Sequence, residues 1–247
     1  MYKRQRPDYV IHHSGYTKNY QSDQYDLELA RSINLKPLDS LFKSLSSISC
    51  QGVILTGSSM EYPSLEQTFN ESCKLRPNSK YGLSKLEATE KAFELAGKYE
   101  IPLNVARIFN PVGRLDKKEK LFPYIVSQVS KGLNVDLSSC EQVRNFHHVD
   151  FVTSSYEVLL DNFDGRQIYN ICHRETRPLK EIILTLVAKL GFSLDHLKFG
   201  VKPMRQGESK YFNGSSEKLE EVYRHGLDLD TNISRMAFDL EEDLKNE

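Results

Sequence analysis

The stretch "QGVILTGSS", residues 51–59, is a short apolar run that ends in a glycine and two serines. Consecutive aliphatic residues are typical of a buried strand, and the small residues after them are typical of a loop at its carboxyl end. About twenty residues further on, "SKYGLSKLEATEKAF" (79–93) follows the start signal Pro77-Asn78-Ser79 and predicts a helix over residues 80–99. The two segments therefore predict a strand, a loop and a helix in succession.

The same alternation continues along the chain. Strands are predicted at residues 8–15, 101–113 and 165–173, helices at 23–45, 121–132 and 179–191, and a strand passing into a helix at 143–160. Pro37 is expected to kink or interrupt the helix at 23–45, because proline has no N–H for the helical hydrogen bond. The last fifty or so residues are polar with short apolar patches, which predicts a small mixed cap. Alternating strands and helices predict an α/β fold, with a parallel sheet covered by helices on both faces.

The bulk composition is that of a globular protein. The 247 residues are 39% hydrophobic and 27% charged, so we expect a packed core and no wholesale disorder. The formal net charge is −1, which gives no global field that favours nucleic acid or an anionic membrane. No apolar run reaches about 18 residues, and no apolar stretch follows the basic start "MYKRQRPDY". Neither a transmembrane helix nor a secretory signal is expected.

The cysteines and histidines do not have the spacing of a metal site. The four cysteines are scattered without a CxxC pair, so reduced thiols packed in the core of a cytoplasmic protein are expected: Cys50, Cys73, Cys140 and Cys172. The pairs at 12–13 and 147–148 are histidines in predicted strands, where neighbouring side chains point to opposite faces. No carboxylate cluster accompanies them, so we expect no metal.

Tyr81 and Lys85 lie one turn apart and share a face of the helix predicted at 80–99. A phenol titrates near pH ~10, and a lysine ammonium beside it is expected to lower that pKa. The pair could then move a proton on and off a sugar or alcohol hydroxyl. Ser58 is placed to position the same oxygen, because the carboxyl ends of parallel strands meet at one edge of a sheet.

Each of these residues also has a plainer interpretation. Tyr-x-x-x-Lys alone is a weak pattern, since both residues are common in surface helices, and Ser58 alone is more often a cap or turn residue. The order of the segments is more specific. A strand with Gly-Ser-Ser precedes Tyr-x-x-x-Lys on a helix, and a strand running into "ARIFNPVG" (106–113) follows.

In this order of segments the chain resembles the extended short-chain dehydrogenase/reductases that modify nucleotide sugars with NAD or NADP. That family includes UDP-galactose 4-epimerase and deoxysugar ketoreductases. "PDYVIHHSG" (7–15) resembles the family's fourth strand, and "ILTGSSMEYP" (54–63) resembles its fifth. "VRNFHHVDFV" (143–152) resembles its Arg-Asp-aromatic-x-His-Val-Asp segment, and "PMRQGES" (203–209) resembles its Pro-x-Arg-x-Gly-Glu/Asp element. The resemblance covers the chain almost from end to end.

The resemblance also implies roles for particular residues. The residues implied to be catalytic are Ser58, Tyr81 and Lys85. Those implied to bind NAD or NADP are Ser14, Gly15, Tyr81 and Lys85. Those implied to bind the nucleotide sugar are Ser59, Asn110, Arg144 and Arg205. The two arginines would grip the diphosphate, because a guanidinium forks across phosphate oxygens. Either arginine could instead be a surface charge, and Asn110 could simply cap the turn before Pro111.

Two features depart from the family pattern. The family opens with strand–GxxGxxG–helix, which binds the cofactor pyrophosphate, whereas the 13 glycines here are dispersed and the chain begins where the fourth strand is expected. Two βα units are therefore expected to be missing, with one sheet edge left open. The chain could be truncated, another polypeptide could cover the edge, or NAD could no longer bind in the usual way. The second departure is Met60, which cannot transfer a proton, so dehydration or carbon-acid epimerisation there is disfavoured.

The resemblance implies an N-terminally shortened Rossmann-like fold with a small mixed α/β substrate cap. Residues 1–170 are expected to form the partial dinucleotide-binding and catalytic domain, with the chain crossing between lobes after about residue 113. Residues 171–247 are expected to form mainly the cap, with one returning strand. The implied function is a 4-epimerase or 4-ketoreductase acting on a nucleotide sugar in surface polysaccharide or deoxysugar synthesis, as a homodimer. The alternatives are a degenerate relative that binds a nucleotide sugar without catalysis, and a subunit that pairs with a partner chain.

Overall fold

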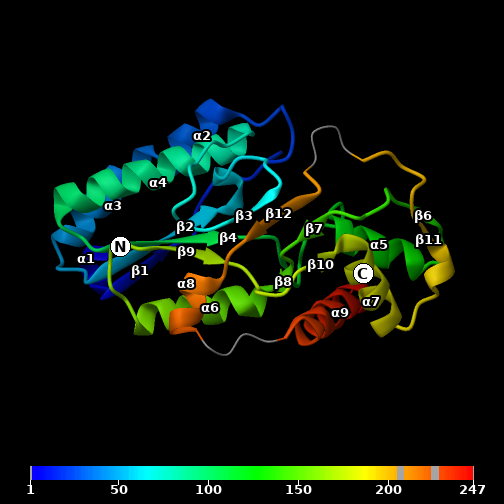
Figure 1. Cartoon of the computed structure of the whole chain (residues 1–247). Helices are drawn as coiled ribbons and strands as arrows, with labels where there is room; N and C mark the ends of the chain where they lie inside the picture. The colour runs from blue at the N-terminus through cyan, green and yellow to red at the C-terminus, as the bar shows by residue number, and fades with distance from the viewer. Residues whose placement is uncertain (1, 205–208, 224–227, 247) are drawn as a thin grey trace.

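A computed structural model of the chain describes residues 2–204, 209–223 and 228–246. Its main sheet has the order β1-β2-β4-β9, with every neighbouring pair parallel. The strands are β1 Tyr9–His12, β2 Gly52–Ser58, β4 Leu103–Ile108 and β9 Ile168–Ile171 (Figure 1). The predicted parallel α/β sheet is confirmed. β1 is an edge strand, paired only with β2 among the described residues.

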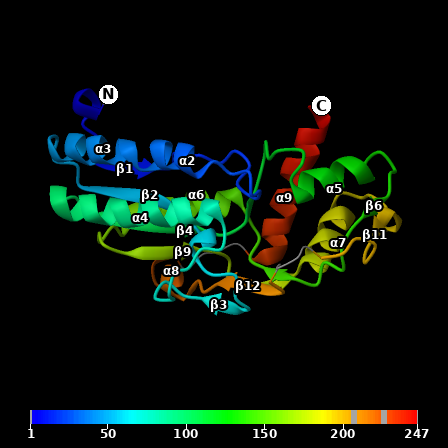
Figure 2. The same cartoon turned by 90° about the horizontal axis from the view of Figure 1, so that it is seen from above.

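Helices cover both faces of this sheet, and the period of two along β2 explains which residues each layer covers. Val53 and Leu55 pack in one core with α3 Lys36–Ser46 and α4 Lys80–Tyr99, whereas Ile54 packs in another with α6 Val149–Asp161 and α8 Glu217–Val222. Figure 1 shows α2 (Leu27–Asn34), α3 and α4 together on one side of the sheet, with α6 and α8 opposite, and Figure 2 shows from above that α4 runs alongside α2 and α3. The site-bearing helix α4 therefore lies on the α2/α3 side.

Local signals fix the helix ends closely. The Ser79 hydroxyl accepts the Gly82 N–H at 3.0 Å to start α4, and Glu100 ends it in the left-handed region with φ 54. The bounds predicted for this helix, 80–99, are those observed. The helix predicted at 23–45 is interrupted near Pro37: α2 ends at Asn34, and the proline occupies the second position of α3. There its missing N–H leaves no hydrogen bond unmade.

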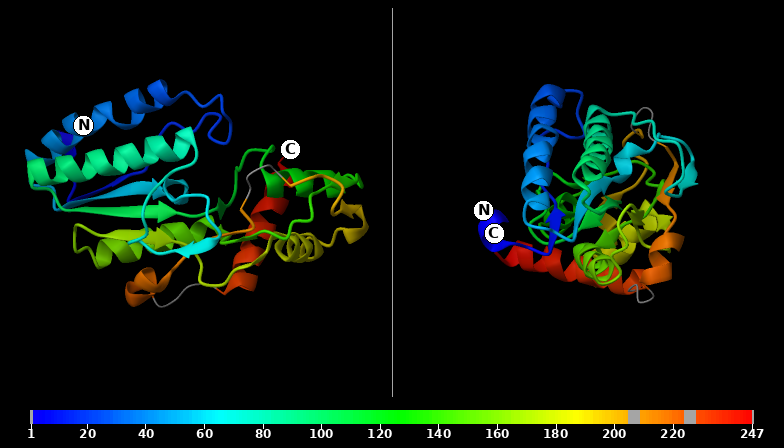
Figure 3. Two further views of the ribbon diagram at one scale, coloured as in Figure 1. Left: turned by 45° about the horizontal axis from the view of Figure 1, so that its top comes forward. Right: turned by 90° about the vertical axis from the view of Figure 1, so that its left-hand side faces the viewer.

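A second lobe is built around helices α5 Leu121–Val129, α7 Leu179–Lys189 and α9 Leu229–Lys245, whose apolar faces share one core (Figure 3). The small cap predicted for the last fifty residues thus contains a 17-residue helix, α9. Its buried residues recur at helical spacing: Leu229, Ile233, Met236 and Leu240. The polar residues between them made these positions look like isolated patches in the sequence.

Short strands connect the two lobes. A second sheet has the order β10-β7-β12-β3, in which β12 pairs in parallel with both β3 and β7. The segment predicted as one strand at 101–113 is divided, with β4 followed by the separate short strand β5. The remaining short elements are α1 Tyr2–Gln5, η1 Ser59–Glu61, β3 Gln67–Phe69, β5 Pro111–Val112, β6 Val135–Asp136, β7 Val143–Arg144, β8 His147–His148, β10 Arg177–Pro178, η2 Leu194–His196, β11 Leu197–Lys198 and β12 Tyr211–Gly214.

Two kinds of feature are absent from the described residues. None of the helices found there combines the length and apolar character needed to cross a bilayer. Within those same ranges, no group of three or more histidine, cysteine, aspartate or glutamate side chains is arranged to hold a metal ion.

Candidate active site

Ser58 ends strand β2 and starts the short helix η1, where it takes part in a reciprocal capping box. Its hydroxyl accepts the Met60 N–H at 3.2 Å, and the Glu61 carboxylate accepts the Ser58 N–H at 2.8 Å. Ser58 is buried, with 7% of its surface exposed. The turn chemistry of η1 therefore fixes this serine at the carboxyl edge of the sheet.

Tyr81 lies in the first turn of α4, close against this serine. Gly82 permits the close approach, since a Cβ at that position would lie 2.1 Å from the Met60 carbonyl oxygen. The Ser58 side chain forms a hydrogen bond with the Tyr81 phenol. Burial raises the pKa of Tyr81 to about 12, while the Ser58 hydrogen bond acts in the opposite direction.

Lys85 does not act on the phenol as the sequence predicted. We expected its ammonium to lower the pKa of Tyr81, and that expectation is wrong for this structure, because burial dominates and raises the pKa. The Lys85 ammonium instead donates to the Thr56 carbonyl oxygen of β2 at 2.5 Å. Burial lowers the pKa of Lys85 itself, and the Glu61 carboxylate opposes this.

Two tyrosines from the loop between β1 and α2 cover the Tyr81 ring. Tyr20 and Tyr25 meet it edge to face, with ring centroids 5.3 and 5.8 Å away. Tyr25 is fixed in turn, since its hydroxyl lies 3.0 Å from the Ser84 hydroxyl and donates to the Tyr16 carbonyl oxygen. This aromatic cover explains the burial that raises the pKa of Tyr81.

Ser14 and Gly15, which are also implied to bind the cofactor, lie just after the end of β1. A Cβ on Gly15 would lie 3.9 Å from the Lys85 Nζ, so this loop borders the lysine, and Ser14 beside it is exposed. The Lys85 ammonium, the hydroxyls of Ser14 and Tyr81, and the absence of a side chain at Gly15 suit the ribose and nicotinamide end of a dinucleotide. For the pyrophosphate end, the sequence holds no GxxGxxG turn.

Two of the residues implied to bind substrate, Asn110 and Arg144, lie near the short strands between the lobes. Asn110 donates to the Asn145 carbonyl oxygen at 2.9 Å, next to Arg144. The Arg144 guanidinium donates to the backbone oxygens of Val143 and Ser209. Ser59 is buried within η1, beside Ser58. Arg205 lies outside the described residues.

Asn145 and Phe151 lie near these residues and serve in hydrogen bonding and packing. Asn145 is fully buried; its amide donates to the His173 carbonyl oxygen and accepts from the Gly214 N–H, each at 2.7 Å. Phe151 belongs to the core beneath α6.

The sequence patterns did not reveal the ion pair that lies beneath Ser58. Glu61 and Arg107 are both fully buried, and the Arg107 Nε donates to the Glu61 carboxylate at 3.0 Å. Ser58-x-x-Glu61 is the sequence signature of a capping box, so Glu61 could have been found from that spacing. Its partner Arg107 comes from β4, which no local pattern connects with Glu61.

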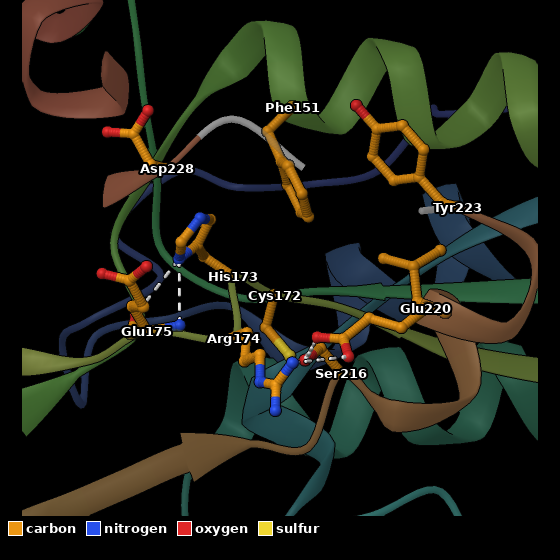
Figure 4. Close-up of a pocket in the computed structure, with 10 residues that line it drawn as sticks. Phe151, Cys172, His173, Arg174, Glu175, Ser216, Glu220, Tyr223 and Asp228 are labelled. Carbon is orange, nitrogen blue, oxygen red and sulfur yellow. Dashed lines mark hydrogen bonds and ion pairs between the residues drawn. The ribbon is translucent and has the colours of Figure 1, made fainter. Parts of the chain in front are cut away.

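A cavity of about 380 Å³ opens on the other side of the sheet from α4 (Figure 4). Its lining comes from α6, α8 and the loop after β9, and includes Phe151 and Tyr223. Arg174 reaches toward Glu220, with 3.7 Å between nitrogen and oxygen, and His173 accepts the Glu175 N–H at 3.0 Å. This cavity is therefore separate from the Ser58, Tyr81 and Lys85 constellation.

Comparison with known proteins identifies the family. Residues 1–172 match the model of the NAD dependent epimerase/dehydratase family. The chain belongs to this family. The resemblance drawn from the sequence motifs is thereby confirmed.

Individual family members have modest identity to the chain. The dTDP-4-dehydro-6-deoxyglucose reductase of Escherichia coli is 29% identical over 61% of this chain and 49% of the relative. The GDP-6-deoxy-D-mannose reductase of Pseudomonas aeruginosa is 25% identical over 87% of this chain and 74% of the relative. The chain thus spans about half the length of the first of these relatives.

Solved structures of the family share the fold. RMD from Pseudomonas aeruginosa, solved in complex with NADPH, superimposes with a TM-score of 0.81 at 21% identity, covering 95% of this chain and 82% of that one. The Rossmann-type α/β architecture predicted from the sequence is therefore confirmed.

Proposed function

We propose that this chain is an NAD(P)-linked nucleotide-sugar enzyme that reduces a 4-keto group or inverts a 4-hydroxyl. The observation that supports this most is the meeting of Ser58, Tyr81 and Lys85 at the carboxyl ends of β1 and β2 in a member of the epimerase/dehydratase family. The two reductases with detectable identity favour the reduction. Met60 favours both over dehydration, because a thioether cannot transfer a proton.

Each residue has a defined task in this proposal. NAD(P), when bound, supplies or accepts the hydride. Tyr81 exchanges a proton with the sugar oxygen, and the Ser58 hydroxyl holds that oxygen in line with the phenol. Lys85 binds the nicotinamide ribose beside Ser14 and Gly15. Arg144 and Arg205 grip the diphosphate of the nucleotide sugar, and Asn110 approaches the nucleotide sugar. We assign residues 1–170 mainly to cofactor and catalysis, and residues 171–247 mainly to substrate.

The raised pKa of Tyr81 has a consequence for this chemistry. With a pKa of about 12 the phenol is protonated near neutral pH, so it is ready to donate a proton to a carbonyl oxygen as that oxygen gains a hydride. Reduction of a ketone needs such a donor at its first step.

The proposal also includes an oligomeric state and a location in the cell. We propose a homodimer, in which the side of the molecule that carries α4 packs against its copy, and a cytoplasmic location, consistent with four cysteines in the thiol form. Light scattering on a sizing column measures the dimer directly. A monomer at micromolar concentration would contradict it.

The experiment that tests the function uses the purified chain with NADH or NADPH and a 4-keto-6-deoxy nucleotide sugar. Loss of absorbance at the nicotinamide wavelength, dependent on the sugar, is the expected result. Calorimetric titration with the nucleotide sugar alone separates the alternative of a non-catalytic binder, which would bind the sugar without oxidising either cofactor.

A further inference from the structure

Beneath the candidate active site lies a buried ion pair with no access to solvent. The side chains of Glu61 and Arg107 are both 0% exposed, with 3.0 Å between the carboxylate and the guanidinium Nε. Isolated buried charges are costly, and even paired ones often contribute little net stability. We therefore expect this buried pair, which lies one turn from Ser58, to have a role other than stabilising the fold.

The contacts of Glu61 lead directly to the catalytic serine. One carboxylate oxygen accepts the Ser58 N–H at 2.8 Å, and the other accepts from Arg107. The Thr89 hydroxyl of α4 also lies 3.4 Å from the first oxygen. Glu61 thus joins the end of β2, the turn η1 and the helix that carries Tyr81.

Arg107 is fixed from its other side by a chain of hydrogen bonds. Its Nη1 donates to the Tyr62 hydroxyl at 3.0 Å, and that hydroxyl donates to the Asn170 side-chain oxygen of β9 at 2.9 Å. Gly57 makes room for the pair, since a Cβ there would lie 2.8 Å from the Glu61 carboxylate and 3.0 Å from the Arg107 Cγ. The pair is therefore held by three strands of the main sheet.

We propose that Glu61 and Arg107 are positioning residues that hold the Ser58 hydroxyl against the Tyr81 phenol through the Glu61–Ser58 backbone hydrogen bond. Neither residue is proposed to touch the substrate. The inference rests on the proposed roles of Ser58 and Tyr81 and adds the device that sets their geometry. Because the geometry can be measured without turnover, its test is independent of the proposed function.

The pKa of the Tyr81 phenol measures the position of Ser58, because it responds to the Ser58 hydrogen bond. Burial raises the pKa of Tyr81 most, Tyr25, Tyr20 and Glu61 raise it further, and the Ser58 hydrogen bond lowers it. On α4 itself, Lys85 faces His12 and His13 at the end of β1. Two variants that carry the same charges, only one of which keeps an acceptor for the Ser58 N–H, isolate the effect of the Ser58 hydrogen bond on the phenol pKa.

Two double variants that differ only at position 61 test whether an acceptor for the Ser58 N–H is needed. Glu61→Gln with Arg107→Met removes both charges but keeps a side-chain oxygen for the Ser58 N–H. Glu61→Leu with Arg107→Met removes both charges and that acceptor. A fluorinated tyrosine placed at position 81, whose phenol is more acidic than that of tyrosine, allows titration by fluorine NMR below the pH of alkaline unfolding.

The expected result is a phenol pKa about half a unit to one unit higher in the Leu variant than in the Gln variant, the range that one hydrogen bond supports. In a Ser58→Ala background the two variants should titrate together. Equal titration of the two variants with Ser58 present, or a persistent difference without it, would overturn the proposal. Should the Leu variant not fold, Glu61→Met with Arg107→Met provides an unbranched apolar substitute.

A matched control comes from a second ion pair on the same helix. Glu87 of α4 binds Arg31 of α2, with 2.5 and 2.8 Å between the charged atoms, at the surface and away from Ser58. Glu87→Gln should leave the Tyr81 titration unchanged. A Glu87→Gln shift as large as the difference between the two double variants would show that the titration reports helix charge in general and would contradict the positioning role.

Discussion

The ammonium of Lys85 on α4 is bound to the carbonyl oxygen of Thr56 on β2, with 2.5 Å between Nζ and O. This bond joins the helix that carries Tyr81 to the strand that carries Ser58. The Thr56 hydroxyl extends the connection, lying 2.9 Å from the His13 Nδ1 and 2.6 Å from the Tyr156 hydroxyl. Lys85 is therefore as much a link between helix and sheet as a neighbour of the phenol.

Replacing Lys85 by methionine tests its proposed role at the cofactor ribose. The apolar stem is kept, so we expect the free energy of unfolding to stay the same or rise, since a buried ammonium is removed. Affinity for NAD(P)H, measured by calorimetry, should fall at least tenfold, roughly the loss of one charge-assisted hydrogen bond. Lys91→Met, which removes a surface lysine paired with Glu94 on the same helix, should bind as the unaltered chain does. Undiminished affinity in the Lys85 variant would remove Lys85 from the site.

Two glycines of α4 give opposite predictions for the same substitution. In Gly82→Ala, the new Cβ would meet the Met60 backbone at 2.1 Å, so the first turn of the helix must move away from η1. We expect the unfolding free energy to fall by about 1–3 kcal/mol. In Gly97→Ala the Cβ meets nothing within 4 Å, and the helix should gain about 0.5–1 kcal/mol. Urea unfolding measures both, and equal effects would show that the close approach of α4 to η1 is wrong.

The buried ion pair predicts a non-additive stability change. Arg107→Met alone leaves the Glu61 carboxylate buried and unpaired, and should lower the unfolding free energy by about 3–5 kcal/mol. Adding Glu61→Gln should restore most of that loss, because no unpaired charge then remains. If the double variant is as unstable as the sum of the two single ones, the two side chains are not paired in the folded protein.

His147 predicts how stability changes with pH. It is fully buried, neither ring nitrogen has a hydrogen-bond partner in the described residues, and burial lowers its pKa to about 3. Between roughly pH 6.5 and 3 the unfolded chain binds a proton at this residue and the folded chain does not, so this contribution to stability falls as the pH falls. His147→Leu should therefore flatten the stability curve in that window. An unaltered slope in the Leu variant would show that His147 is protonated in the folded state.

The parts of the fold that could be predicted are those with a local cause. The bounds of α4 follow from the Ser79 cap and the apolar spacing after it, and the break near Pro37 follows from its missing N–H. Helix α9 was missed because its core residues, such as Ile233 and Met236, are separated by polar residues that lower the average hydropathy. The spacing of the buried positions was nevertheless present in the sequence.

The candidate site divides in the same way. Ser58, Tyr81 and Lys85 could be selected because strand, loop and helix signals place them at one sheet edge. The direction of the Tyr81 pKa change could not be predicted, because the rings that bury Tyr81 come from Tyr20 and Tyr25, in a loop some sixty residues earlier. Long-range packing of this kind has no signature in a local pattern, and here it reversed the expected direction of the pKa change.

The central claim is that Tyr81 is the proton donor of a nicotinamide-dependent reaction on a nucleotide sugar. The most direct measurement is the rate of NADPH and NADH oxidation by the purified chain with a 4-keto-6-deoxy nucleotide sugar, for the unaltered chain and for Tyr81→Phe. We expect sugar-dependent oxidation that falls by about 10²- to 10⁴-fold in the variant, with sugar affinity retained. Oxidation at an unchanged rate in Tyr81→Phe would contradict the assignment of the donor, and no oxidation by the unaltered chain would contradict the catalytic function itself.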